Sequence, residues 1–260
     1  MRRSLLSALC LLPLLSCAPA ATGGLPRSTT PAPAATPVRP AADTTFRAAF
    51  SNDGVVWVRG GQACVARAPS FRTVCPRLPA VTDVAWNNGE AWAAVPSVDA
   101  VVTLDGAPRS VPVGRVVTLS SGRVYREDGS AVTFAGTAAR GVAGAPTQAV
   151  TDGQGEEFVV LSDALRRVSD GAVLERAAGP YLVALPSGAR TQEAPETVGQ
   201  FGSYRLANGR LEALDALGQV RHAVTHGPGR VGVVGQWVVT VSPAGTLRLF
   251  DSQLQERSQL

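Results

Sequence analysis

The sequence predicts an all-β fold, a β-propeller of six four-stranded blades, and three observations lead to it. An aromatic residue returns at a nearly constant step along the chain. Asp-Gly and Asn-Gly pairs, which favour tight hairpin turns, recur between short apolar runs. From Phe46 onward, no apolar run keeps helical spacing for more than a couple of turns. A repeat of roughly 20–50 residues is typical of folds that stack one supersecondary unit, and four antiparallel strands per unit are typical of a propeller blade.

The recurring aromatic residues give the length of the unit. They are Trp57, Trp92, Tyr125, Phe158, Tyr204 and Trp237. The steps between them are 35, 33, 33, 46 and 33 residues, and a glycine stands two or three residues before each one. A structural role explains such a recurrence better than ligand binding does. We therefore expect each ring to lie as a wedge between neighbouring blades, burying roughly 150–250 Å².

The second unit shows what one repeat contains. Short apolar runs occupy 81–86, 90–95, 99–104 and 109–113, with Asn88-Gly89 and Asp105-Gly106 between them, which predicts four strands joined by tight turns. The first strands of the six units begin near Phe46, Val81, Arg115, Thr147, Tyr181 and Arg230. The outer strands of the third and fifth units are weak, which leaves a count of five or seven blades open. Residues 254–258 would give the last unit its own outer strand.

The long step of 46 residues contains a polar, proline-containing segment, 186–199. Such a composition predicts a surface loop inserted into the repeat. As the one departure from the repeat, this loop is the best candidate for a contact with a partner, through Arg190, Glu193 and Glu196. A solvated insertion without a partner is the alternative.

Two segments carry a recognisable short pattern. One has Gly209, Leu211, Ala213, Leu214, Asp215 and Gly218, and the other has Gly245, Leu247, Phe250 and Asp251. The pattern resembles the repeat of quinoprotein-type (PQQ-like, WD40-like) propellers, although the turn is one residue shorter and the closing tryptophan is missing. The resemblance covers about two units and implies the propeller fold. It implies no cofactor, since many propellers with this repeat bind no quinone.

The N-terminus has the features of a secretory signal. Arg2 and Arg3 precede an apolar run from Leu5 to Leu15, which is shorter than the roughly 20 residues that a membrane-spanning helix needs. The run ends in Leu-Leu-Ser-Cys, which resembles the lipobox of bacterial lipoproteins. The resemblance implies that residues 1–16 are removed and that Cys17 carries a diacylglycerol thioether and further acyl chains such as palmitate. An ordinary signal peptidase site at residues 18–20 is the alternative.

Residues 17–45 then form a lipidated Pro/Ala/Thr-rich tether, and 46–260 form the propeller. Several acyl chains on one residue hold a protein durably at a membrane. The lipoprotein resemblance implies a place in the cell envelope. Because Ala18 rather than aspartate follows Cys17, it favours the outer membrane facing the periplasm, with the extracytoplasmic face of the plasma membrane as the alternative.

Cys64 and Cys75 are the two cysteines of the predicted propeller. They fall on the predicted third and fourth strands of the first unit. A turn centred on residues 69 and 70 places residues whose numbers sum to 139 opposite each other, and these two numbers do so. We expect a cross-strand disulfide, as suits an oxidising compartment. Two free thiols are the alternative, and a zinc site would need two more soft ligands.

The residues offer little for catalysis. Once Arg2 and Arg3 are removed, 22 basic residues face 20 acidic ones without a basic run, so nucleic-acid binding has no support. His222 and His226, four apart on a strand, would stand about 13 Å apart, too far to chelate one metal. The predicted innermost strands carry Asp83 and Asp152 as their acids, the only candidates for a paired-carboxylate hydrolase. We expect Asp152 to serve a turn and Asp83 to bond within the channel.

The sequence therefore predicts no catalytic residue, no metal and no cofactor. It favours a non-catalytic, lipid-anchored scaffold that contacts other proteins of the cell envelope. Binding of a small ligand or glycan at the central channel is the alternative, with Trp86 as the one further aromatic that could stack on a sugar. A propeller hydrolase is the weakest of the three hypotheses.

Overall fold

The structure is a computed structural model and describes residues 46–260. The predicted signal peptide (1–16), the lipid attachment at Cys17 and the tether (17–45) lie outside the described residues. Within 46–260, no helix has the length and apolar character needed to cross a membrane.

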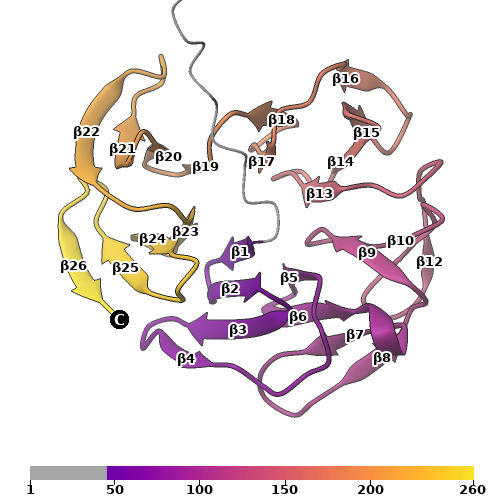
Figure 1. Cartoon of the computed structure of the whole chain (residues 1–260). Coiled ribbons are helices and arrows are strands. Elements are labelled where there is room, and N and C mark those ends of the chain that lie inside the picture. The colour runs from indigo at the N-terminus through magenta and orange to yellow at the C-terminus, as the bar shows by residue number, and fades with distance from the viewer. Residues whose placement is uncertain (1–45) are drawn as a thin grey trace, which may run out of the picture. The chain divides into compact units, whose positions relative to one another are not determined.

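Seven antiparallel sheets follow one another around a ring (Figure 1). The first three are β1 (Arg47–Ser51), β2 (Gly54–Arg59), β3 (Gln62–Arg67) and β4 (Arg72–Val74); β5 (Asp83–Asn87), β6 (Glu90–Val95), β7 (Ala100–Thr103) and β8 (Ser110–Pro112); and β9 (Val116–Leu119), β10 (Val124–Arg126), β11 (Ala131–Val132) and β12 (Ala138–Ala139). The fourth and fifth are β13 (Gln148–Thr151), β14 (Glu157–Leu161), β15 (Ala164–Arg167) and β16 (Val173–Glu175); and β17 (Tyr181–Ala184) with β18 (Ala189–Gln192). The last two are β19 (Glu196–Gly199), β20 (Gly202–Ala207), β21 (Arg210–Leu214) and β22 (Val220–Thr225); and β23 (Arg230–Val234), β24 (Trp237–Val241), β25 (Leu247–Phe250) and β26 (Glu256–Gln259).

The prediction of six four-stranded blades is confirmed, and a two-stranded sheet, β17–β18, stands between two of them. The first strand of each sheet is the innermost, so β1, β5, β9, β13, β17, β19 and β23 surround the centre in that order. The last of these contacts the first, which closes the ring. Each sheet is complete in chain order, because the last blade ends with its own outer strand, β26.

The interpretation of 186–199 as an inserted surface loop is wrong. This segment contains β18 and β19, the second strand of the two-stranded sheet and the first strand of the next blade. Arg190 therefore lies on β18 and Glu196 begins β19, while Glu193 lies in the short connection between them. The polar composition misled because β19 lines the channel and the polar side chains of β18 and β19 find partners within the protein, as in the Arg190–Glu196 ion pair, rather than an apolar layer.

Apolar side chains between neighbouring sheets form the core. Trp92, Tyr125, Phe158 and Tyr204 each lie in the cluster shared with the following sheet. Trp57 instead lies in the cluster with the last sheet, where Trp237 also packs.

Trp57 faces the other neighbouring blade because it stands at a different position in its strand. Gly54 itself pairs with Ser51, so Trp57 is the fourth residue after the turn, whereas Trp92 is the third, after Glu90 pairs with Asn87. A shift of one residue turns a side chain to the other face of a strand.

Candidate functional site

The centre of the ring holds a channel of about 360 Å³, lined by residues from all seven innermost strands. Each of these strands is the edge of its sheet and pairs on one side only. Alternate backbone N–H and C=O groups of an edge strand point away from its partner, here toward the channel. All seven innermost strands run in the same direction, because each one is the first strand of its sheet in chain order. One mouth of the channel is therefore formed by the residues with which these strands begin.

The starting residues supply the polar side chains of this mouth. They are Arg47 of β1, Asp83 of β5, Gln148 of β13, Tyr181 of β17, Glu196 of β19 and Arg230 of β23, and all of them line the channel. We call this set the channel mouth. The side-chain amide of Gln148 joins β13 to the next innermost strand: its Nε2 donates to the Pro180 carbonyl at 3.2 Å, and its Oε1 accepts from Leu182 N–H at 3.0 Å.

The two arginines of the mouth reach across it to the same side. Arg47 Nη2 donates to the carbonyl oxygen of Thr147, just before β13, at 2.9 Å. The guanidinium carbon of Arg230 lies 4.9 Å from the ring centroid of Tyr181 on β17 and 5.3 Å from that of Phe46. Because β13 and β17 are neighbours in the ring, the two guanidinium groups converge on one wall of the channel.

Asp83 is buried at the mouth and bonded to the neighbouring blade, as the sequence suggested. Its Oδ2 accepts from Thr118 Oγ1 at 2.6 Å and from Leu119 N–H at 2.9 Å, and its Oδ1 accepts from Val84 N–H. Three neutral donors thus hold this carboxylate, which ties β5 to β9. Such bonding fixes a carboxylate in place and leaves few of its lone pairs for a substrate.

Sequence alone does not identify Glu196 as a channel residue, because the polar, proline-containing composition of 186–199 predicts a loop. Only 2% of its side chain is exposed, and it forms an ion pair with Arg190 of β18. Arg190 has 42% of its side chain exposed, so the pair lies at the boundary between the channel wall and solvent. The step of 46 residues between Phe158 and Tyr204 could have revealed this strand, because it is longer than the other steps by enough residues to form one more hairpin.

Asp152 serves a turn, as predicted. Its Oδ1 accepts from the N–H groups of Gln154 and Glu156 at 2.8 and 2.9 Å, and its Oδ2 accepts from Gly188 N–H at 2.6 Å. Burial would raise the pKa of this carboxyl, but the backbone hydrogen bonds, that of Gly188 first, outweigh burial and lower it. Asp152 thus joins its own hairpin to the β17–β18 hairpin. Asp83 is likewise held by bonds within the protein, and neither is presented as a free acid or base.

The histidines do not share a site. His222 is exposed on β22, whereas His226 is buried after the end of that strand. The Nε2 of His226 lies 2.8 Å from Thr240 Oγ1, and its Nδ1 lies 2.7 Å from the Gly227 carbonyl oxygen. Burial lowers the pKa of His226, so the neutral ring is favoured. Among residues 46–260, no group of three or more His, Cys, Asp or Glu side chains is arranged to hold a metal ion.

A buried carboxylate between the third and fourth blades was not singled out from the sequence. Glu157 accepts hydrogen bonds from Thr151 Oγ1 at 2.6 Å and from Tyr125 O–H at 3.0 Å. Burial raises the pKa of Glu157, and burial together with the charge of Glu157 raises that of Tyr125. Gly122 makes room for the carboxylate, because a Cβ there would lie 2.4 Å from Glu157 Oε1. The site joins two blades, and Thr151, which donates to Glu157, also lines the channel.

The predicted disulfide is present, joining Cys64 of β3 to Cys75 just after β4. The observed register pairs Val65 with Val74 and Arg67 with Arg72, whose numbers sum to 139 as expected. The bridge therefore extends the ladder of these two strands by one cross-strand pair.

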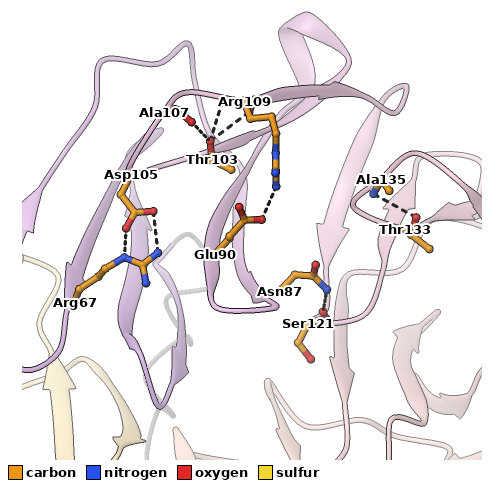
Figure 2. A network of polar contacts seen from close by, with 10 residues as sticks. All are labelled: Arg67, Asn87, Glu90, Thr103, Asp105, Ala107, Arg109, Ser121, Thr133 and Ala135. Atoms are coloured by element: carbon orange, nitrogen blue, oxygen red, sulfur yellow. Dashed lines mark hydrogen bonds and ion pairs between the residues drawn. The ribbon is translucent and has the colours of Figure 1, made fainter.

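Polar contacts also join the first three blades (Figure 2). Arg67 forms an ion pair with Asp105 of the second blade, and Asn87 Nδ2 donates to the Ser121 carbonyl of the third at 2.7 Å. Arg67 also covers the ring of Trp86, its guanidinium carbon 5.1 Å from the centroid. Trp86 is 4% exposed and donates through Nε1 to the Ala49 carbonyl, so it presents no open ring face on which a sugar could stack.

No protein-family model and no curated protein sequence matches the chain. Among solved structures, BamB from Moraxella catarrhalis is 14% identical, with 79% of this chain and 84% of that chain covered and a TM-score of 0.44. Streptogramin B lyase is 9% identical, with 82% and 81% covered and a TM-score of 0.40. Apo AztD from Citrobacter koseri is 10% identical, with 83% and 85% covered and a TM-score of 0.41. The likeness is one of fold alone, and all three are β-propellers.

Proposed function

We propose that this chain is a non-catalytic scaffold of the cell envelope, attached to a membrane through Cys17, whose propeller binds another envelope protein. The observation that carries the proposal is a group of exposed apolar side chains on the two blades that flank the two-stranded sheet. They are Val173 (41% exposed), Leu174 (45%), Phe201 (48%), Leu217 (83%) and Val220 (49%). We call this group the apolar end.

Topology places all five at one end of the ring. In an antiparallel sheet whose four strands follow one another in chain order, the turn between the first and second strands and the turn between the third and fourth strands lie at the same end of the sheet. Phe201 is in the first turn of the β19–β22 blade, and Leu217 is in its third turn, directly before β22. Val173 begins β16 directly after the third turn of the β13–β16 blade. This end is the one at which the innermost strands finish, opposite to the channel mouth.

A contiguous exposed apolar patch marks a protein interaction site more often than scattered apolar side chains do. Phe201, Leu217 and Val220 share one end of a single blade, and Val173 and Leu174 lie at the same end of the blade on the other side of the two-stranded sheet.

The other large exposed apolar residues of the described part are Val74, Val98 and Leu260. They lie on three different blades. Val74 ends β4, Val98 lies in the turn between β6 and β7, and Leu260 follows β26, so all three lie toward the end of the ring that carries the channel mouth. The tether would join the propeller at Phe46, beside the channel mouth, so the apolar end is the surface farther from the point of attachment.

The carboxylates in and beside the channel support a binding role over hydrolysis. Asp83 and Asp152 each accept three hydrogen bonds from within the protein, and Glu196 is ion-paired with Arg190. A paired-carboxylate mechanism needs one carboxyl to exchange a proton and the other to meet the substrate or a water. These carboxylates would have to give up structural contacts to do either.

The test is crosslinking and co-purification of the full-length protein from solubilised envelopes. We expect a defined partner to be captured with the natural protein and lost with Phe201→Glu or Leu217→Glu, because a charge in the contact would have to be desolvated. The matched control is Val98→Glu, which introduces the same charge at a residue that is 53% exposed and outside the apolar end.

Capture of the same proteins by all three variants would refute the apolar end as the contact. The location is tested separately by mass spectrometry of the N-terminal peptide. The proposal requires an acylated Cys17, and a mature N-terminus produced by cleavage near residues 18–20 would contradict it.

A further inference from the structure

We propose that the partner of this chain contributes an extended segment with acidic side chains, which pairs as an additional strand with the free edge of β22. This inference rests on the proposed scaffold function and specifies how the partner is recognised. Strand addition uses the backbone hydrogen-bonding groups of an exposed sheet edge for affinity and the neighbouring side chains for specificity.

β22 (Val220–Thr225) stands at the rim of the ring, and it is the longest of the outer strands within 46–260 (Figure 1). It has six residues, whereas the other outer strands have four (β26), three (β4, β8 and β16) or two (β12). Proteins usually keep edge strands short or covered, because a long exposed edge invites another strand to pair with it. A six-residue edge that begins at the apolar end therefore points to a partner strand.

The edge of the two-stranded sheet is covered. β18 has no third strand beside it, but Thr191 N–H donates to Glu175 Oε1 at 3.0 Å, and Gly179 N–H donates to Thr191 Oγ1 at 2.7 Å. The segment 175–179 thus lies along this edge. A partner strand would have to displace that segment, so β18 is a poorer candidate than β22.

The register of the blade shows which groups of β22 face outward. His226 N–H donates to the Gly209 carbonyl at 2.9 Å, and successive pairs of residues across β21 and β22 alternate between bonded and non-bonded. This alternation turns the N–H and C=O groups of Ala223 and Thr225 away from β21. Within 46–260, the hydrogen bond that reaches these outward groups comes from Arg248 Nη1, 3.5 Å from the Thr225 carbonyl oxygen. Both N–H groups and the Ala223 carbonyl are left for a partner.

The charges around β22 favour an acidic partner. Arg210 stands opposite Thr225 in the register, and Arg221 is the extra residue of a bulge near the start of the strand. Both arginines are exposed, and neither forms an ion pair with another residue of 46–260. The acidic side chains of β21 and β26 are already paired with arginines of the strands beside them.

A second copy of this chain fits the edge less well than an acidic segment does. Two β22 edges paired with each other would bring four arginines without an acidic partner into one interface, and like charges placed together oppose association. An acidic segment would instead neutralise Arg210 and Arg221. Because Arg221 and Thr225 are four residues apart, we expect two acidic residues at about that spacing in the partner.

Apolar side chains stand at the start of the same strand. Val220 is 49% exposed, and Leu217, in the preceding turn, is 83% exposed. Contact with these two side chains requires apolar residues in the partner segment as well. β-branched residues satisfy this requirement and also favour an extended backbone.

The test uses the purified full-length protein and two synthetic eight-residue peptides. Both peptides read Val-X-Val-Thr-Val-X-Val-Thr, with glutamate at X in one and lysine at X in the other. Fluorescence anisotropy of the labelled peptides measures binding. We expect the glutamate peptide to bind about fivefold or more tightly than the lysine peptide, and we expect added salt to reduce this difference.

Amide hydrogen exchange shows where the glutamate peptide binds. The N–H groups of Ala223 and Thr225 should exchange more slowly in the complex, because an added strand accepts hydrogen bonds from them. The matched control is the N–H of Gln259 on β26. It also faces outward, because the adjacent Leu260 exchanges both of its backbone hydrogen bonds with Leu247 of β25. Its exchange should not change.

Two variants test the edge itself. Ala223→Pro removes one outward N–H without removing a bond to β21, a change that edge strands tolerate. It should abolish binding of the glutamate peptide and capture of the partner from solubilised envelopes, whereas Gln259→Pro, the matched control, should affect neither. Arg221→Glu leaves the backbone unchanged and should remove the preference for the glutamate peptide. Thermal unfolding checks that each variant folds.

The proposal is overturned if neither peptide slows exchange at Ala223 and Thr225, or if the lysine peptide binds as tightly as the glutamate peptide. It is also overturned if the protein alone forms a dimer that Ala223→Pro dissociates, because the occupant is then a second copy. Capture that survives Ala223→Pro but is lost with Phe201→Glu overturns strand addition and leaves the scaffold proposal standing. No capture by the natural protein overturns the scaffold proposal, and the peptide measurements then decide whether the edge of β22 accepts a strand.

Discussion

The ring of Phe50 on β1 lies against the backbone of Gly232 on β23, where the first blade meets the last. A Cβ placed on Gly232 would be 2.0 Å from Phe50 Cγ and 2.5 Å from its Cβ. No strand is exchanged between these two blades, so side-chain packing rather than a hydrogen-bond ladder closes the ring. The absence of a side chain at 232 is what allows the two innermost strands to approach.

Gly232→Ala should therefore destabilise the protein by about 1–3 kcal/mol, the usual cost of an extra group in a well-packed core. Shortening Phe50 cannot relieve the contact completely, since its own Cβ is among the atoms met. Chemical denaturation measures the free energy of unfolding. Gly227→Ala is the control, because a Cβ at position 227 meets nothing within 4 Å. Equal stability of the two variants would mean that the closure does not depend on this contact.

The disulfide should stabilise the first blade, since it ties β3 to the end of the short outer strand β4. Closing a loop of 11 residues' separation contributes roughly 2–3 kcal/mol by the chain-entropy model. Replacing both Cys64 and Cys75 by Ala should lower the free energy of unfolding by about this amount. A reductant should then lower the melting temperature of the natural protein but not that of the double variant. Two titratable thiols in the folded natural protein would contradict the bridge.

Local patterns in the sequence were sufficient for much of the fold. Asn88-Gly89 and Asn208-Gly209 have positive φ at both residues (48° and 74°, 52° and 72°), as the tight hairpin turns inferred from these pairs require. The sum rule that paired Cys64 with Cys75 succeeded because an antiparallel register is fixed by its turn. Six of the seven innermost strands begin within two residues of the predicted starts.

The parts that could not be predicted depend on contacts between distant segments. The strand β19 was hidden because its neighbours are polar, and only the Arg190–Glu196 pair and the adjoining blades explain such a strand beside a channel. The convergence of Arg47 and Arg230 likewise needs the ring to close, since these residues are far apart in the chain. Glu157 could not be recognised as buried, because Thr151, Tyr125 and Gly122 meet it across two blades.

Glu157 should make stability decrease as pH rises. Burial raises its pKa above the ordinary value of 4.5. The stability linked to its protonated form is fully present below that value and is lost as pH rises through the folded-state pKa. Glu157→Gln stays neutral, so its free energy of unfolding should improve relative to the natural protein between pH 4.5 and pH 7.5. Denaturation at these two pH values measures the difference.

Glu256 provides the control for this measurement. Its pKa is lowered, chiefly by the hydrogen bond from Arg248, so it favours the fold at neutral pH and loses that contribution on acidification. Glu256→Gln should therefore change the pH dependence in the opposite direction to Glu157→Gln. If the free energy of unfolding changed with pH in the same way for the natural protein and for Glu157→Gln, burial would not destabilise the ionised carboxylate of Glu157, and the prediction would be wrong.

His226 should make the protein less stable in weak acid. Its neutral ring can donate from Nδ1 to the Gly227 carbonyl and accept at Nε2 from Thr240 Oγ1, and burial lowers its pKa below the ordinary 6.5. As pH falls below 6.5, the unfolded chain takes up a proton before the folded one does, so stability declines until the folded-state pKa is passed. His226→Gln should remove this decline and should lower the free energy of unfolding by roughly 1–3 kcal/mol at pH 7.5, because a buried hydrogen-bonding partner is lost.

The pH dependence of His226 is best measured in the Glu157→Gln background, which removes the opposing effect of Glu157. The control is His222→Gln, which changes an exposed histidine. An unchanged decline between pH 7 and pH 5 in the His226 variant would assign the acid sensitivity to another group.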